Sequence, residues 1–306
     1  MRQDAPAQTA AAPLRQGIVL LDKPRGLSSN HALQRVRRLL GGVKAGHVGS
    51  LDPLASGMLP ICLGEATKIA GDILAGAKRY RFTVALGART ATGDTEGAVL
   101  ETAPVPELER AALEARLRGF VGPQLQVPPM YSALKRGGEP LYKLARAGVS
   151  VERAARPIEL FELALLGVAG NELTLETLCS KGTYVRTLAE DLARALGTCG
   201  HVTALRRVSV APFEACAMQT LESMESVCAA GGLPPILPAD QALTHLPAVH
   251  LHPEQVRRVQ CGESVFVAGT AAASRIRLYA PDGAFLGLGE CDARGNVQPR
   301  RMFIQG

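Results

Sequence analysis

The chain has 306 residues, of which 47% are hydrophobic and 20% charged, so it has enough apolar material for one large or two smaller packed domains. Its seven cysteines are odd in number and include no Cys-x-x-Cys pair. This pattern argues against a disulfide framework and a zinc site, and it predicts a reducing, cytoplasmic environment. No segment is apolar over the length that a membrane-spanning helix needs.

The formal net charge of +6 is unevenly distributed along the chain. Residues 15–90 contain 12 Lys and Arg against 4 Asp and Glu, whereas residues 91–306 contain 21 against 23. A local basic surplus of this kind fits a polyanionic partner. A solvated basic surface with no such partner would give the same composition.

The first elements follow from apolar runs and their breakers. Residues 1–16 are rich in Ala, Gln and Pro and are predicted to form a disordered tail. Residues 17–29, "GIVLLDKPRGLSS", predict a short strand that breaks at its Pro and Gly, after which Ser28 or Ser29 can cap a helix. In residues 30–42 the apolar side chains share one helical face, and two glycines end the helix.

The middle of the chain predicts alternating strands and helices. Residues 46–57, "GHVGSLDPLASG", are predicted to form a loop, followed by the end of a strand and a helix over residues 61–74. The β-branched and aromatic residues of segment 78–87 favour a strand. Residues 106–120 predict a helix with Pro106 near its start.

A basic, tyrosine-containing segment at 126–148 is punctuated by Pro and Gly and is predicted to be an inserted arm with a helix in its second half. Two strands across a Gly-Asn turn follow within residues 158–180, and then a helix over residues 181–197. Residues 212–247 lose regular periodicity and are interpreted as a linker region. Residues 248–306 predict a small separate β domain.

The loop at 46–57 presents a single carboxylate, Asp52. An Asp-Pro pair in a loop is most often only a turn initiator. The neighbouring glycines, however, would allow a ligand to approach closely, and the following proline restricts the backbone of Asp52. A catalytic carboxylate needs a cation to orient it, and Arg186 in "SKGTYVRT" is the candidate. Arg186 would otherwise be a surface residue, although it lies at the unfavourable end of the helix dipole.

Two tyrosines and a histidine could contribute to the same site. Tyr80 lies among cations in "KRYRF", and Tyr184 precedes Arg186 by two residues. Aromatic rings interleaved with cations suit unpaired RNA bases, although a tyrosine at the edge of a core is individually more common. His47 could titrate or donate to RNA, but a lone histidine is usually structural. The sequence contains no Ser-His-Asp triad, P-loop or H-E-x-x-H pattern.

Several segments stand in a fixed order: "LLDKPRGLSS", "AGHVGSLDPLASGMLPICLGEATK", "KRYRFTVALGARTATGDTEG", "PPMYSALKRGGEPLYKLARAG", "CSKGTYVRTLAEDLA" and "HVTALRR". From about Gly17 to its C-terminus the chain resembles the bacterial TruB family, the tRNA pseudouridine-55 synthases. One departure is Val48, where the family more often has Thr. We expect little consequence, because this position does not have to act on the substrate.

The resemblance implies an α+β fold. Its catalytic domain, residues 17–247, would have a mixed, mainly antiparallel central sheet flanked by helices. Residues 126–148 would be an RNA-clasping insertion in that domain. Residues 248–306 would form a small, β-barrel-like RNA-binding domain of the PUA type, which is the weaker part of the resemblance.

The resemblance also assigns roles to residues of the site. Asp52 would be the catalytic aspartate, paired with Arg186. Tyr80 would stack on the target base, and Tyr184 would approach the base near C5 as a candidate general base. Leu205, in a segment that resembles the family's leucine loop, would line the pocket.

Further positions carry weaker implied roles. His47 would lie near the flipped-out nucleotides, and Asp94 would anchor the segment that carries Tyr80. Lys23 and Lys68 would make phosphate or structural contacts.

The implied reaction breaks the C1′–N1 bond of a uridine, turns the uracil and joins C1′ to C5. Because it is an isomerisation, it needs no metal or cofactor, and one carboxylate suffices. Asp52 would either attack as a nucleophile or remove a sugar proton, and the sequence leaves both routes open. The substrate would be the T-arm stem-loop of tRNA, whose uridine must be extruded. The enzyme would be a monomer without an obligate protein partner.

Two other functions remain to be distinguished from this one. The protein could be a tRNA-binding or tRNA-folding module without catalysis, although the set of Asp52, Tyr80, Tyr184 and Arg186 argues against that alternative. It could also belong to the guide-dependent synthases, although the arm at 126–148 is more like that of stand-alone enzymes. Activity of the purified protein on bare RNA would separate these possibilities.

Overall fold

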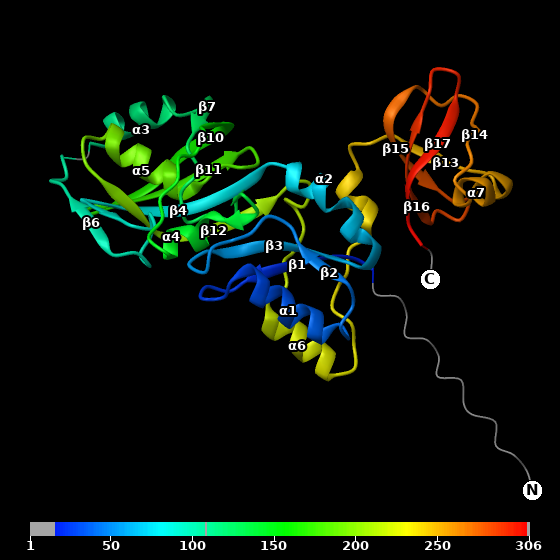
Figure 1. The fold of residues 1–306 in the computed structure, drawn as a ribbon, viewed down its shortest axis with the longest axis horizontal. Helices are drawn as coiled ribbons and strands as arrows, with labels where there is room; N and C mark the ends of the chain where they lie inside the picture. Colours follow the sequence, from blue (N-terminus) through cyan, green and yellow to red (C-terminus); the bar gives the residue numbers. More distant parts are fainter. Residues whose placement is uncertain (1–15, 108, 305–306) are drawn as a thin grey trace, which may run out of the picture.

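The computed structural model describes residues 16–107 and 109–304. The predicted tail therefore lies outside the described residues, except for Gln16. Figure 1 shows a large body built on one long sheet and a small C-terminal body at one end of it. The predicted α+β class is confirmed.

The large body is built on an eight-stranded mixed sheet. Every neighbouring pair is antiparallel except β3 and β12, which are parallel. The path across the sheet is β1 (Gly17–Lys23), β3 (Ser56–Leu63), β12 (Gly200–Val210), β4 (Lys78–Leu86), β11 (Glu172–Cys179), β10 (Arg156–Ala169) and β7 (Gly122–Gln126), with β2 (Ala45–His47) paired to β3.

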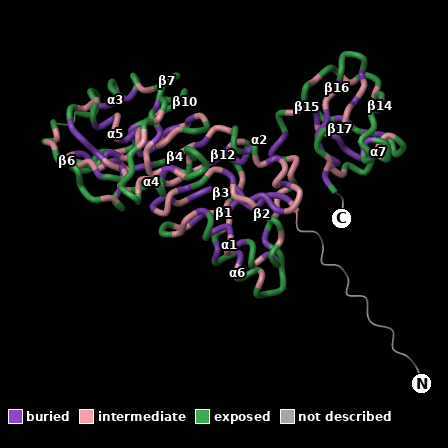
Figure 2. Tube along the Cα trace, viewed as in Figure 1, coloured by how far each residue is buried: buried purple, intermediate pink, exposed green. Residues whose placement is uncertain are grey.

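Successive strand residues point to opposite sides of the sheet, and at β1 both sides are buried. On β1, Val19 and Leu21 belong to one core, whereas Ile18 and Leu20 belong to another. The first core is covered by α1 (Ser29–Leu39), α3 (Arg110–Arg118), α5 (Val185–Ala195) and α6 (Leu221–Ala229). The second is covered by the 3-10 helix η1 (Gly64–Ile69), α2 (Ala70–Ala75) and the 3-10 helix η2 (Ala239–Leu243). Figure 2 shows the buried residues running along the sheet strands.

Two insertions between strands extend from the sheet. The first is a ribbon of β5 (Ala88–Thr90) and β6 (Val99–Thr102). The second is the arm, which contains the hairpin of β8 (Lys135–Arg136) and β9 (Glu139–Pro140) followed by α4 (Leu141–Arg146). The predicted helix in the second half of the arm is thus confirmed.

The small body has a five-stranded sheet and a core of its own. Its order is β13 (Ala248–His250), β15 (Ala273–Tyr279), β16 (Phe285–Cys291), β17 (Asn296–Met302) and β14 (Val265–Phe266), with α7 (Pro253–Gln260) beside it. Phe303 and Leu288 pack with the second core of the large body, and the Asp240 carboxylate accepts a hydrogen bond from the Tyr279 hydroxyl at 2.8 Å. The small body is therefore in direct contact with the large one.

Local predictions at the N-terminus are confirmed. The first strand ends at Lys23, and Ser28 caps α1 by accepting a hydrogen bond from the amide of His31 at 3.2 Å. The helix predicted at 106–120 begins only at Arg110, so the placement of Pro106 near its start is wrong.

The linker interpretation of residues 212–247 is also wrong. Ile18 and Leu237 exchange backbone hydrogen bonds of 2.8 Å, and Gln219 bonds to the backbone of β1 in the same way. Leu221 and Met224 of α6 are fully buried in the first core. The apolar residues of this segment show no regular spacing, because short helices alternate there with isolated backbone hydrogen bonds to the edge strand β1.

Candidate active site

The segment that carries Asp52 connects β2 to β3 and is held by its own backbone and one buried hydroxyl. The Oγ of Ser29 accepts a hydrogen bond from the amide of Leu51 at 2.7 Å and donates to its carbonyl at 2.9 Å. The carbonyl of Asp52 accepts a hydrogen bond from the amide of Ala55 at 3.0 Å, which closes a turn. The turn that Asp-Pro predicts is therefore present, and its role is to fix the carboxylate.

Arg207 joins the two ends of this segment. Its Nε donates to the carbonyl of Met58 at 2.6 Å, and its Nη2 donates to the carbonyl of Gly49 at 2.8 Å. A Cβ at Gly49 would come within 3.2 Å of the Arg207 guanidinium, and Gly49 has a φ of +69°. Gly49 is therefore required both for its backbone conformation and for the close approach of this arginine.

Arg186 lies in the first turn of α5 with its side chain only 5% exposed. Its Nε lies 2.9 Å from Oδ2 of Asp52, its Nη1 donates to the carbonyl of Thr92 at 2.7 Å, and its Nη2 donates to the carbonyl of Tyr131 at 2.7 Å. The guanidinium thus joins the Asp52 loop, the β5–β6 connection and the arm. The expected pairing of Asp52 with Arg186 is present in this geometry.

Asp94 lies behind the same guanidinium and is almost completely buried. Its Oδ2 lies 3.8 Å from the Nε of Arg186, while its Oδ1 accepts hydrogen bonds from the Thr92 hydroxyl and from the amide of Glu96. Arg186 therefore lies between two carboxylates, one of which faces a cavity.

Opposing influences act on the Asp52 carboxyl. Burial raises its pKa above the usual range, and the negative charge of Asp94 raises it further. The positive charge of Arg186 and its hydrogen bond lower that pKa, as does the charge of Lys23. The side chain is still 40% exposed, because it opens onto the cavity.

This cavity has a volume of about 400 Å³ and brings together most of the residues that the sequence selected. Asp52, Tyr80, Tyr184, Arg186 and Leu205 all line it. Asp52 is the one carboxylate among the described residues of the lining.

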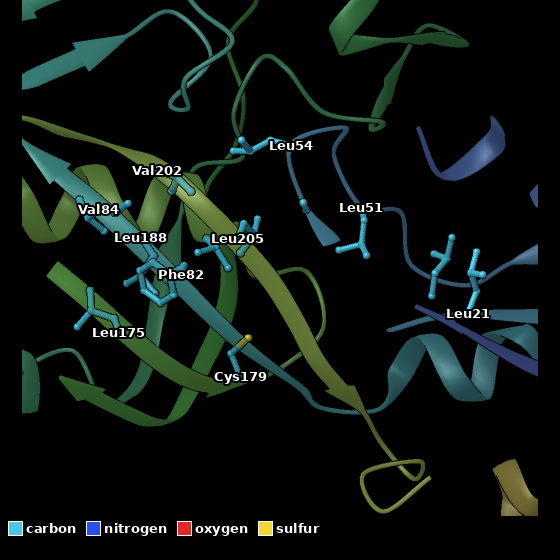
Figure 3. Packing of buried hydrophobic residues seen from close by; sticks show 14 of the residues in the cluster. Leu21, Leu51, Leu54, Phe82, Val84, Leu175, Cys179, Leu188, Val202 and Leu205 are labelled. Carbon is cyan, nitrogen blue, oxygen red and sulfur yellow. The ribbon is translucent and has the colours of Figure 1, made fainter. Parts of the chain in front are cut away.

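Leu205 comes from the middle of β12, so the expectation that it lies in a loop is wrong. It is directly opposite Phe82 of β4 in the sheet register. Figure 3 shows Leu205, Phe82 and Leu188 packed in the first core. A strand residue backed by packed side chains gives the cavity a rigid apolar wall.

The two tyrosines are neutral phenols in this environment. Burial is the main cause that raises the pKa of Tyr80, against the opposing charge of Arg207. Burial also raises the pKa of Tyr184. Gln126 holds the backbone of Tyr184, with its Oε1 accepting from the amide at 2.8 Å and its Nε2 donating to the carbonyl at 3.1 Å.

Four of the predicted site residues, Asp94, Lys23, His47 and Lys68, lie outside the cavity lining. Lys23 is completely buried and donates to the carbonyls of Pro24 and Leu27, and burial lowers its pKa to about 8. The buried Nδ1 of His47 has no hydrogen-bond partner among the described residues, and burial lowers the pKa of His47.

Lys68 lies at the contact between the two bodies. Its Nζ donates to the carbonyl of Met302 at 2.7 Å and pairs with Glu65, and it lies over the ring of Phe303. This position suits a structural contact.

The sequence did not reveal Arg207, Lys78 or Gln126 as parts of the site. Lys78 is buried in the cavity wall, where its Nζ donates to the carbonyls of Leu74 and Gly76 and its pKa is lowered by burial to about 8. Two sequence features could have pointed to these cations: the double arginine of "LRR" and the position of Lys78 near Tyr80. Only the fold, however, shows that these cations face inward.

Known proteins resemble most of the chain. Residues 37–185 match the model described as TruB family pseudouridylate synthase (N terminal domain). Residues 186–244 match the model of the tRNA pseudouridylate synthase B C-terminal domain, and residues 247–303 match that of Pseudouridine synthase II TruB, C-terminal. The "tRNA pseudouridine synthase B" of Aromatoleum aromaticum is 50% identical over 286 residues, which cover 94% of this chain and 92% of that protein.

The chain belongs to the TruB family. The family consists of pseudouridylate synthases, which are isomerases. A second relative, the "tRNA pseudouridine synthase B" of Chromohalobacter salexigens, is also 50% identical and covers 94% of each chain. The departure at Val48 lies within a TruB match that extends on both sides of it.

The TruB chain also shares its fold with solved structures of low sequence identity. A chain from the structure of an H/ACA RNP bound to a substrate RNA containing 2′-deoxyuridine aligns with a TM-score of 0.72 at 21% identity, covering 95% of this chain and 86% of that one. A chain from an archaeal box H/ACA sRNP complex aligns with a TM-score of 0.70 at 21% identity, covering 95% and 87%.

Two further observations concern the described part of the chain. None of its helices combines the length and apolar character needed to traverse a bilayer. No group of three or more His, Cys, Asp and Glu side chains within residues 16–107 and 109–304 is placed to hold a metal ion.

Proposed function

We propose that the chain isomerises uridine 55 in the T-loop of tRNA to pseudouridine, acting alone as a cytoplasmic monomer and without a cofactor. The observation that carries this proposal is the cavity of about 400 Å³ in which Asp52, held by Arg186, is the one carboxylate among the described lining residues. The identity to enzymes named "tRNA pseudouridine synthase B" supports tRNA as the substrate.

The reaction fits what the cavity can do. An extruded uridine stacks on the ring of Tyr80, with its ribose against Asp52. Asp52 starts the reaction either by nucleophilic attack or by removing a sugar proton, and both routes need the ionised carboxylate that Arg186 favours. A glycosidase would pair two carboxylates across the bond, whereas the second acid here, Asp94, is buried behind Arg186.

The detached uracil has to turn without leaving. Leu205 and the ring of Tyr80 enclose it between an apolar wall and a stacking surface. Tyr184 would then accept the C5 proton once C1′ is bonded to C5. For this step Tyr184 must first lose its hydroxyl proton to solvent, because only the phenolate can take up a proton. Burial opposes that loss by raising the pKa of Tyr184, whereas the hydrogen bond with Ser132 and the positive charges of Arg156 and Arg186 favour it by lowering that pKa.

The arm supplies a surface for the RNA backbone. Its cations lie at residues 135, 136, 143 and 146, and none of them pairs with a carboxylate of the described chain. Unpaired cations along one segment can neutralise successive phosphates, so tRNA affinity should fall as salt rises. His47, Lys23, Lys68 and Asp94 would support the fold of the site and of the domain contact.

The test is to incubate purified protein with an unmodified tRNA transcript and map pseudouridine. A transcript with cytidine at position 55 is the matched substrate control, and Asp52→Asn is the matched protein control. Pseudouridine at position 55 with the unaltered protein alone is expected. Product at other positions, or none on bare RNA, would contradict the proposal, and the second result would favour a guide-dependent enzyme.

A further inference from the structure

Gln126 lies outside the lining of the active-site cavity but binds the backbone of Tyr184, which lines it. It is the last residue of β7 and is only 4% exposed. Its side-chain amide forms two hydrogen bonds to the backbone of Tyr184, at 2.8 and 3.1 Å. In this way the side chain of Gln126 pairs with Tyr184 much as the backbone of a neighbouring strand would.

Tyr184 needs such a partner because of where it lies. It is the N-cap residue of α5, with an extended backbone (φ −98°, ψ 109°), and no side chain from residues 16–107 or 109–304 caps the helix at this position. The amide of an N-cap residue has no partner within the helix. Without Gln126, that amide would lose its hydrogen bond, and the direction in which Tyr184 enters the helix would be less restricted.

The same stretch of chain also contacts Arg186. Five residues after Gln126, the carbonyl of Tyr131 accepts a hydrogen bond from Nη2 of Arg186 at 2.7 Å. The start of the arm therefore holds both Tyr184 and the arginine that pairs with Asp52. We propose that Gln126 is a positioning residue for the reaction, which sets the location of Tyr184 and of the first turn of α5 relative to Asp52.

This inference rests on the proposed function, because it concerns the rate of that reaction. Gln126 reaches no part of the cavity, so its loss should leave tRNA binding intact and slow the chemical step. Misplacement of a reacting group by about 1 Å can cost about a hundredfold in rate. We therefore expect between about tenfold and a hundredfold from the loss of both hydrogen bonds.

The experiment compares Gln126→Met with Gln124→Met. Methionine is close to glutamine in length and removes both hydrogen bonds. Gln124 lies on the same strand, but its side-chain amide donates to the carbonyl of Phe120 at 2.7 Å, within its own segment of the chain. For each variant, single-turnover isomerisation at saturating tRNA, the tRNA dissociation constant and the melting temperature are measured, with rates taken well below the lower melting temperature.

Gln126→Met should lose at least about tenfold in saturating rate with a nearly unchanged dissociation constant, while Gln124→Met keeps its rate. Equal rates for the two variants, or a loss of affinity with the saturating rate preserved, would overturn the inference. If Gln126→Met does not fold, Gln126→Glu keeps the acceptor for the Tyr184 amide and must show the same separation of rate from affinity. An inactive unaltered protein would instead refute the proposed function.

Discussion

Replacing Arg186 by lysine tests the geometry at the centre of the site. The guanidinium makes three contacts, to Asp52 at 2.9 Å and to the carbonyls of Thr92 and Tyr131 at 2.7 Å each. A lysine keeps the positive charge but has one nitrogen on a flexible stem, so an ammonium that stays with Asp52 gives up the two carbonyls. Arg186→Lys therefore removes the orientation of the cation while retaining its charge.

The size of the effect follows from those two hydrogen bonds. A hydrogen bond from a charged donor contributes about 1.5–3 kcal/mol. Thr92, Tyr131 and Arg186 also border a second cavity, from which water can replace part of each bond. The lower end of the range is therefore appropriate, and two bonds give about 3 kcal/mol, or roughly a hundredfold in the single-turnover rate if all of it is lost from the transition state.

The pH dependence of the same variant gives a second, independent readout. Arg186 lowers the pKa of Asp52 against the raising effect of burial. A less well placed cation lowers it less, so the pKa of Asp52 rises and the ionised fraction falls at a given pH. The acid limb of the rate profile should move to higher pH, with the loss relative to the unaltered enzyme greater at about pH 5 than at about pH 8.

The assay is release of the C5 hydrogen from labelled uridine in tRNA at saturating enzyme. A rate within about threefold of the unaltered enzyme across this pH range would refute the reasoning, because it would mean that the two carbonyl contacts of Arg186 are unimportant. An equal loss of rate at every pH, without a shift of the acid limb, would agree with the positioning role of Arg186 but contradict its effect on the pKa of Asp52.

Three further substitutions probe the same cavity. Asp52→Asn should bind tRNA normally and release no C5 hydrogen, and substantial turnover would contradict its catalytic role. Tyr80→Leu should lose far more rate than affinity, and the reverse pattern in binding and single-turnover assays would contradict stacking. Asp94→Asn removes a charge that raises the pKa of Asp52, so the acid limb should move to lower pH, opposite to Arg186→Lys; an upward shift in the measured profile would contradict that electrostatic role.

The residues proposed to touch substrate could be chosen from the sequence because each stands in a distinctive local context. Asp52 is surrounded by glycines and followed by proline, Tyr80 lies among cations, and Arg186 lies at the wrong end of a helix dipole. The structure brings these three and Tyr184 to one cavity. The strand β1 and the helix α5 were also predicted from local patterns, the first from an apolar run that breaks at Pro24 and the second from the spacing of its apolar residues.

The supporting residues could not be found in this way, because their roles depend on contacts between distant segments. Gln126 is 58 residues from Tyr184, and Arg207 is 158 residues from Gly49. Neither has a local pattern that separates it from other glutamines and arginines. The error at Leu205 has a related cause, because a motif of small, apolar and basic residues does not distinguish a loop from a central strand.

The charges around the cavity explain how one carboxylate can serve in a buried site. Burial alone would favour the protonated form of Asp52. Arg186 and Lys23 oppose that effect on one side, while the buried cations Arg207 and Lys78 form the wall beside Tyr80 without a carboxylate partner in the described chain. Burial disfavours the charged forms of the two lysines and lowers the pKa values of Lys23 and Lys78 to about 8. This excess of positive charge favours a phosphate-bearing nucleotide and any negative charge that develops on its detached base. The positive charges of the cavity are therefore better compensated with substrate bound than without it.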